Sequence, residues 1–249
     1  MPVGAGSSTY TADRAWGADT RRLSVNVASD GTILGLTAVP VQPLPPDPLA
    51  GYTSPVTYRL PFDGTWWVLW GGDTELLNYH AATASQRHAY DVMVWRDGAT
   101  HKGDGTRNED YWVWSQLVLV PAAGEVVPVV DGQPDNTPGQ VGGAETHPAG
   151  NHVVIQTAPD EYVYLAHLRR DTIQVVPGDM VEPGDLLGLA GNSGNSSEPH
   201  LHIHIQTESD FFDPAAQGVS LVFTGYLTDG EPVAAGVPRQ GQFIAPASG

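Results

Sequence analysis

The amino-acid sequence predicts a mainly β protein built from antiparallel strands. Its apolar residues occur in short runs of Val, Leu and Ile that Gly, Pro, Asp and Asn interrupt. Turn-forming residues are abundant, with 29 glycines and 21 prolines among 249 residues. No long stretch has the apolar periodicity of an amphipathic helix. We therefore expect a compact antiparallel sheet, or a barrel-sandwich-like core, with little helix.

Residues 1–55 are predicted to form an N-terminal extension. Residues 1–21 are expected to be a mobile lead, and RLSVNVASDGTILGLTA at residues 22–38 has the hairpin pattern of two strands around an Asp-Gly turn. Six prolines between Pro40 and Pro55 then predict a stiff linker or a strap lying on a surface. A hairpin is too small to fold alone, so this one either packs on the main domain or remains from a truncated one.

The main domain is expected over residues 56–230, with a C-terminal tail at 231–249. Alternating apolar patterns predict its strands at residues 88–95, 112–120, 125–130, 151–157, 161–168 and 200–207. Two Pro-Gly-Asp turns within VVPGDMVEPGDLLGLAG, at residues 175–191, indicate tight consecutive turns in a compact sheet. Residues 210–217 are expected to make one short helical turn.

Charge and cysteine content exclude several classes of function. The net charge of −17 argues against nucleic acid as a partner and against docking on anionic membranes. No apolar run reaches membrane-spanning length, and the first twenty residues lack the basic start and apolar core of a signal peptide. Because the chain has no cysteine, any bound metal must be held by His, Asp or Glu.

Three histidines stand at alternate positions in GNSGNSSEPHLHIHI, residues 191–205. On a strand, His200, His202 and His204 would share one face, and the apolar residues between them would face the core. Neutral imidazole is a common zinc ligand, whereas exposed strand faces more often carry Thr, Lys, Glu or Ser. This pattern favours a functional site over an exposed edge strand. The preceding glycines permit close approach of a ligand, although that loop alone is typical of a plain turn.

One strand cannot supply a whole zinc site, because a catalytic site generally has three protein ligands and an open position. Further ligands must come from other parts of the chain. The candidates are His80, His88, Asp91, His101, His147, His152 and His167.

The motifs SEPHLHIHI, YLAHL at residues 164–168 and VVPGDMVEPGDLLGLAGNSG between them resemble those of the lysostaphin-type (LytM-like) zinc peptidases. The resemblance covers roughly residues 60–210 and implies a compact antiparallel β fold. It also implies that His202 is a zinc ligand. His200 is then a catalytic histidine beside the substrate carbonyl, and His167 is its catalytic partner.

The first ligand pair departs from the family pattern, which has His, three residues and then Asp. Arg87 occupies the expected position of the histidine, and His88 lies only three residues before Asp91, which on a regular strand puts the two on opposite faces. His80, in NYHAATASQRHAYD, precedes the strand and is free of its register. A family branch with a similar stretch favours His80, Asp91 and His202 as ligands, with His88 as the substitute for His80.

The resemblance implies a zinc-dependent metalloendopeptidase that hydrolyses the peptide cross-links of bacterial peptidoglycan outside the cytoplasm. One alternative is a degenerate, non-catalytic relative that binds cell wall or regulates other wall hydrolases. Another is a phosphocarrier, since the turns at 175–188 also resemble those of carrier modules; the absence of lysine between Arg170 and Arg239 argues against a biotinyl or lipoyl carrier. His204 would either steady a ligand or be partly exposed, and Trp112 and Trp114 would line the substrate path or join the core.

Overall fold

The computed structural model describes residues 7–17, 19–41, 43–72, 74–143 and 145–247. The chain divides into two compact units, Met1–Pro45 and Pro46–Gly249. Strands dominate the described residues, and their pairings within the sheets are antiparallel, which confirms the predicted fold class. Among the described residues, none of the helices has the length and apolar character that a membrane span requires.

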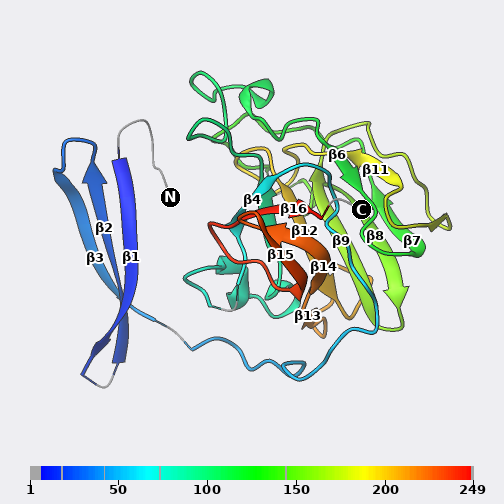
Figure 1. The fold of residues 1–249 in the computed structure, drawn as a ribbon, viewed down its shortest axis with the longest axis horizontal. Coiled ribbons are helices and arrows are strands. Elements are labelled where there is room, and N and C mark those ends of the chain that lie inside the picture. Colours follow the sequence, from blue (N-terminus) through cyan, green and yellow to red (C-terminus); the bar gives the residue numbers. More distant parts are fainter. Residues whose placement is uncertain (1–6, 18, 42, 73, 144, 248–249) are drawn as a thin grey trace. The chain divides into compact units, whose positions relative to one another are not determined.

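The first unit is a three-stranded antiparallel sheet of β1 (Ser7–Trp16), β2 (Asp19–Ala28) and β3 (Ile33–Pro40), in that order (Figure 1). Strands β2 and β3 form the predicted hairpin, whose turn is closed by a hydrogen bond from the Thr32 amide to Asp30 Oδ1 of 2.9 Å. Strand β1 was not expected. It lies within the segment predicted as a mobile lead, of which residues 1–6 are outside the described part. Its apolar positions match those of β2, because Tyr10 lies opposite Val25.

The second unit contains one large sheet, a small two-stranded sheet and three short 3-10 helices. Its strands are β4 (Trp66–Trp70), β5 (Tyr90–Met93), β6 (Leu117–Leu119), β7 (Gly124–Val130), β8 (Asn151–Ala158), β9 (Glu161–Leu168), β10 (Met180–Val181), β11 (Leu186–Leu189), β12 (Leu201–Gln206), β13 (Gly218–Val219), β14 (Phe223–Thr228), β15 (Glu231–Gly236) and β16 (Phe243–Pro246). The 3-10 helices are η1 (Tyr79–Ala82), η2 (Ala84–Gln86) and η3 (Asn108–Asp110). The large sheet has the order β10-β7-β8-β9-β12-β5-β4-β16-β14-β15, with β13 paired to β12, and the small sheet joins β11 to β6.

Strand β12 lies in the middle of the large sheet, between β9 and β5. All six of its residues are buried. The apolar side chains Leu201, Ile203 and Ile205 enter the hydrophobic core, as the alternating pattern predicted. The histidines therefore occupy the opposite face of a central strand rather than the surface of an edge strand.

Three segments differ from the sequence-based expectation. Residues 231–249, expected as a tail, supply β15 and β16, and β16 pairs with both β4 and β14. Only Leu117–Leu119 of the predicted strand at 112–120 is a strand, because the chain turns at Ser115 with a left-handed φ of 63°. Residues 210–217 form turns, and none of them is helical.

Within the second unit, residues 52–58 at the end of the proline-rich segment are held in place by Glu161. The carboxylate of Glu161, which is 1% exposed, accepts hydrogen bonds from Tyr52 Oη (2.7 Å), Ser54 Oγ (2.7 Å) and Tyr58 Oη (2.8 Å). A buried carboxylate is stable only when several donors satisfy it, so these contacts hold residues 52–58 against β9.

Candidate metal centre

Asp91 and His202 face each other across two neighbouring strands. They are cross-strand partners in the register of β5 and β12, so their side chains emerge on the same face of the sheet. His202 Nδ1 lies 2.9 Å from Asp91 Oδ1, and both residues are buried. The register of one antiparallel pair thus places an imidazole and a carboxylate in direct contact although they are far apart in the sequence.

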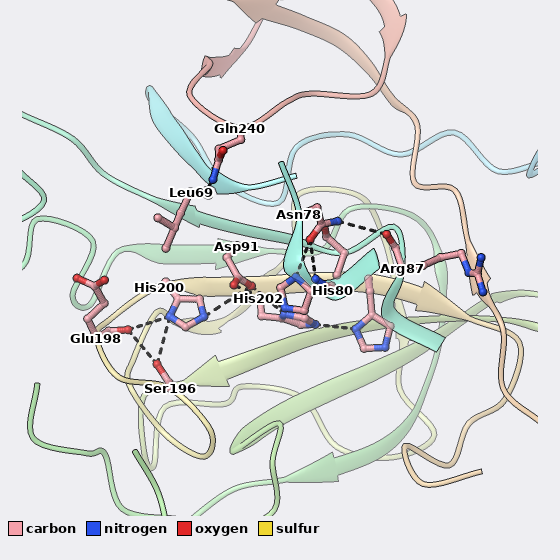
Figure 2. A network of polar contacts seen from close by, with 12 residues as sticks. Leu69, Asn78, His80, Arg87, Asp91, Ser196, Glu198, His200, His202 and Gln240 are labelled. Carbon is pink, nitrogen blue, oxygen red and sulfur yellow. Dashed lines mark hydrogen bonds and ion pairs between the residues drawn. The ribbon is translucent and has the colours of Figure 1, made fainter. Parts of the chain in front are cut away.

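His80 reaches the same carboxylate from η1. Its Nε2 lies 3.7 Å from Asp91 Oδ2. The Asn78 side chain caps η1 and accepts hydrogen bonds through Oδ1 from the His80 amide (3.2 Å) and from His80 Nδ1 (2.9 Å) (Figure 2). Asn78 Nδ2 donates to the carbonyls of residues 87 and 89 at 3.2 and 3.0 Å, so Oδ1 has to be the acceptor. The proton of His80 therefore lies on Nδ1, and the Nε2 lone pair faces Asp91.

Charge and burial support a metal centre at this point. Burial raises the pKa of Asp91, but the neighbouring His80, His200 and His202 outweigh it and hold the pKa well below its usual value. Burial lowers the pKa of His80 to about 4, although Asp91 opposes the shift, so this imidazole is neutral at pH 7. One anionic oxygen and neutral imidazole nitrogens are the donors that zinc prefers.

The spacing of the donor atoms is close to that of a zinc site. One ligand atom from each of His80, Asp91 and His202 lies within 4.8 Å of the other two. Tetrahedral zinc with ligands at about 2.0–2.1 Å needs donors roughly 3.3 Å apart, so small side-chain movements would bring the three into range. Three protein donors leave a fourth position open, as in a catalytic zinc site.

His88, the substitute ligand considered from the sequence, lies elsewhere. Its Nε2 is 3.2 Å from Asp47 Oδ2, which lies within the proline-rich segment. Its spacing of three from Asp91 excludes a shared face of β5, and the chain before β5 turns His88 toward Asp47 instead. The structure therefore groups Asp91 with His80 and not with His88.

Two further histidines lie beside the three candidate ligands. His200 Nδ1 donates to the carbonyl oxygen of Glu198 at 2.8 Å, and its Nε2 lies 3.7 Å from Asp91 Oδ1 (Figure 2). His167 Nδ1 donates to the carbonyl oxygen of Ser193 at 2.8 Å. The centroids of the two rings are 4.7 Å apart. Because each Nδ1 is a donor, the neutral form of either ring has its lone pair on Nε2.

His167 has an unusual backbone. Its φ is +61°, a left-handed conformation that is costly for a residue with a side chain. Its amide donates to the carbonyl oxygen of Ala149 at 3.0 Å, and its carbonyl oxygen accepts from the Gly191 amide at 3.1 Å. Burial lowers the pKa of His167 well below its usual value, helped by His200 and His202, so the ring is neutral. Such strain is frequent at functional sites.

The glycines before the histidine strand serve backbone packing rather than the close approach of a ligand that the sequence suggested. A Cβ on Gly191 would lie 2.3 Å from the Arg169 nitrogen, and one on Gly194, whose φ is +73°, would lie 2.3 Å from the Gly150 nitrogen. No side chain fits at either place. This tight packing puts the carbonyl oxygen of Ser193 within reach of His167.

His204 and Gln206 continue the row of buried polar side chains along β12. His204 Nδ1 lies 2.9 Å from His202 Nε2, and its Nε2 lies 3.1 Å from Gln206 Oε1. Of the two roles considered from the sequence, the structure favours contact with a candidate ligand, because His204 is only 1% exposed and touches His202. Gln206 and Asn78, which contact the candidate histidines, were not predicted from the sequence. Both stand two residues from a candidate histidine, and that spacing was the available signal.

The remaining candidates lie outside this cluster. His101 and Tyr111 form an isolated bridge, and His152 lies in β8 with its ring 4.5 Å from that of His147. Trp112 and Trp114 pack against the edge of the core, each with an arginine over its ring: Arg96 on Trp112 and Arg169 on Trp114.

Part of this chain is similar to a known peptidase family. Residues 116–214 match peptidase family M23, which confirms the resemblance seen in the motifs. The matched segment includes His167, His200 and His202, whereas His80 and Asp91 precede it.

Two curated proteins share a similar segment. An uncharacterised metalloprotease of Buchnera aphidicola subsp. Baizongia pistaciae is 33% identical over 66 residues, which cover 26% of this chain and 17% of that protein. Endolysin 2638A of Staphylococcus phage 2638A is 40% identical over 58 residues, which cover 23% of this chain and 12% of the endolysin. The similar segments thus span less than a fifth of either relative.

Among solved structures, a mutant catalytic domain of the prophage-encoded M23 protein EnpA from Enterococcus faecalis aligns with a TM-score of 0.35 and 19% identity. The alignment covers 68% of this chain and 90% of that domain.

Proposed function

Because residues 116–214 carry a domain of peptidase family M23, we propose that this protein is a zinc metalloendopeptidase that hydrolyses the peptide cross-links of bacterial peptidoglycan. The single observation that carries the proposal is the convergence of His80, Asp91 and His202 in one buried group of potential ligands. Two more histidines, His167 and His200, stand beside it with their Nδ1 atoms tied to carbonyl oxygens.

In this proposal His80 Nε2, an Asp91 carboxylate oxygen and His202 Nδ1 hold the metal. Bound zinc would supply Lewis acidity, which activates water near neutral pH and polarises an amide carbonyl. The residues fit this role because the His80 proton is fixed on Nδ1 and the Asp91 carboxylate is ionised.

His200 and His167 would move protons and bind the oxygen that becomes negative during attack. In the neutral form of either ring the Nε2 lone pair is available, so Nε2 can accept a proton from the attacking water. Once protonated, the same Nε2 can donate to the developing oxyanion or to the leaving amine. The hydrogen bonds from Nδ1 to the carbonyl oxygens of Glu198 and Ser193 keep both rings in orientation through these steps.

The complete set of histidines supports an enzyme over a non-catalytic wall-binding relative. A phosphocarrier would need neighbouring histidines but gives no reason for the buried Asp91 between His80 and His202. The proposed substrate also implies action outside the cytoplasm.

The test combines metal content with hydrolysis. We expect the wild type to bind one zinc ion and to release soluble fragments from purified peptidoglycan. His200→Gln should keep the zinc but lose activity by about 10²–10⁴-fold, because glutamine cannot accept a proton at that position. His202→Ala should lose both. A zinc-free wild type, or full activity in His200→Gln, would contradict the proposal.

A further inference from the structure

A row of hydrogen bonds extends from His202 away from Asp91, along the buried face of β12. It joins His202 Nε2 to His204 Nδ1 (2.9 Å) and His204 Nε2 to Gln206 Oε1 (3.1 Å). The alternation of side chains on β12 puts all three on one face, and Gln206 is 0% exposed. Water has no direct access to the far end of this row, so each of its atoms needs a partner within the protein.

The orientation of Gln206 is fixed by the backbone. Its Nε2 donates to the carbonyl oxygens of Glu208 (2.8 Å) and Asp210 (2.9 Å). Only the NH₂ end of the amide can donate to two carbonyl oxygens, so Oε1 has to point at His204. At that end of the row Gln206 is therefore an acceptor.

An acceptor at Gln206 sets the proton positions on both rings. His204 is 1% exposed and its ring nitrogens contact His202 and the uncharged amide of Gln206, so a charged ring would be costly there and His204 carries a single ring proton. That proton must lie on Nε2 to reach Gln206 Oε1, which leaves the lone pair of His204 on Nδ1. His202 Nε2 must then donate to His204 Nδ1, and the lone pair of a neutral His202 is left on Nδ1, the atom beside Asp91.

The opposite tautomer would break the row. A proton on His202 Nδ1 could donate to Asp91 Oδ1, but the row would then end with two lone pairs facing each other at Gln206. The Asp91 carboxylate thus favours a proton on Nδ1 of His202, whereas the Gln206 amide, through His204, favours a proton on Nε2. Two buried acceptors that face each other cost more free energy than a typical hydrogen bond contributes. The anchored Gln206 amide therefore has a large influence on which tautomer of His202 is populated.

We propose that Gln206 and His204 are positioning residues that hold His202 in the tautomer with an unprotonated Nδ1, and that this raises the affinity of the site for zinc. The inference rests on the proposed function, because it takes His202 Nδ1 as a metal ligand. Asn78 does the equivalent for His80, with its own amide anchored on backbone carbonyls and the proton held on Nδ1. The two amides select different nitrogen atoms of the two histidines.

Three variants separate this role from packing. His204→Phe keeps a ring to stack on Tyr164, whose ring centroid lies 4.7 Å away, but it cannot accept a hydrogen bond from His202. His204→Asn loses the ring but can present an oxygen near the position of Nδ1. Gln206→Met keeps much of the volume and removes the anchored acceptor. Loss of a hydrogen-bond partner of a metal ligand typically weakens metal binding by about 10–100-fold.

The first readout is zinc affinity, measured by competition with a chelator. We expect His204→Phe and Gln206→Met to bind zinc about 10–100-fold more weakly than the wild type, with His204→Asn weakened less than His204→Phe. Wild-type affinity in the folded Phe and Met variants would overturn the inference. Weaker binding by Asn than by Phe would overturn it as well, because it would indicate that the ring matters only for packing.

The second readout is the tautomer of His202 in the metal-free protein, from ¹⁵N NMR shifts at about pH 8, where neutral imidazole dominates. We expect an unprotonated Nδ1 in the wild type and a shift toward protonated Nδ1 in Gln206→Met, where Asp91 is unopposed. An unchanged tautomer would refute the relay even if His204→Phe failed to fold. If the wild type bound no zinc, the proposed function would fail, while the NMR result would still decide whether the relay exists.

Discussion

Asn78 offers a sharp test of how the site is built, because one buried amide serves both the fold and His80. Asn78 is 0% exposed. It makes four hydrogen bonds of 3.2 Å or less, two as donor to the carbonyls of residues 87 and 89 and two as acceptor from His80. Replacement by alanine would leave all of these partners without the amide.

The expected loss of stability can be worked out from these four hydrogen bonds. A buried hydrogen bond contributes about 1 kcal/mol net, so four of them represent roughly 4 kcal/mol, and entry of water into the vacated space would return part of it. We expect Asn78→Ala to lower the free energy of unfolding of the metal-free protein by about 3 kcal/mol. Because the ring of His80 loses its orientation, zinc affinity should fall by about 10–100-fold.

Asn78→Asp is the matched control. It keeps an acceptor for His80 but sets a carboxylate oxygen against two backbone carbonyls. We expect a stability loss at least as large as that of Asn78→Ala, with zinc affinity reduced far less, by about threefold or less. Urea unfolding and chelator competition measure the two quantities separately. If Asn78→Ala unfolded within about 0.5 kcal/mol of the wild type and bound zinc equally well, the reasoning about anchored amides would be refuted.

Three further predictions test other parts of the structure. Glu161→Gln should lower the free energy of unfolding by about 1–3 kcal/mol, because three hydroxyl donors lose a carboxylate acceptor. Residues 46–55 should also be cleaved faster by proteases, and an unchanged cleavage rate would contradict this prediction. Burial lowers the pKa of His152 to about 4, so its stabilisation is present above about pH 6.5 and is lost as the pH falls toward 4. In His152→Phe the loss of stability between pH 7 and pH 5 should shrink by about 2 kcal/mol, and an equal slope in urea unfolding would argue against it. His88→Ala should leave zinc affinity unchanged while His80→Ala abolishes it, and the reverse order would exchange their roles.

The sequence was most informative where residues alternate on a strand. Three histidines at alternate positions, His200 just before β12 and His202 and His204 within it, predicted a shared polar face opposite a core face, and the apolar partners are buried as expected. The odd spacing of His88 from Asp91 predicted that the two would not share a face, and His88 contacts Asp47 instead. Period-two patterns constrain the backbone locally, so they can be recognised from sequence without knowledge of the fold.

Features that depend on distant partners could not be predicted in this way. Asn78 and Gln206 act through backbone carbonyls whose positions depend on turns elsewhere in the chain. Strands β15 and β16 pair with β14 and β4, and β4 lies more than 150 residues earlier in the sequence. Strand β1 is stabilised by pairing with β2, and the sequence of residues 7–16 alone does not reveal that partner.

Conversion of cross-linked muropeptide dimers into monomers is the most direct test of the proposed activity. Purified peptidoglycan would be incubated with the zinc-loaded protein and, separately, with His202→Ala, and the released muropeptides would be identified by mass spectrometry. We predict that dimers disappear and monomers accumulate with the wild type alone, and the masses of the new ends would identify the bond that is cut. Intact dimers after incubation with a wild type that holds one zinc ion would contradict the proposed peptidoglycan endopeptidase.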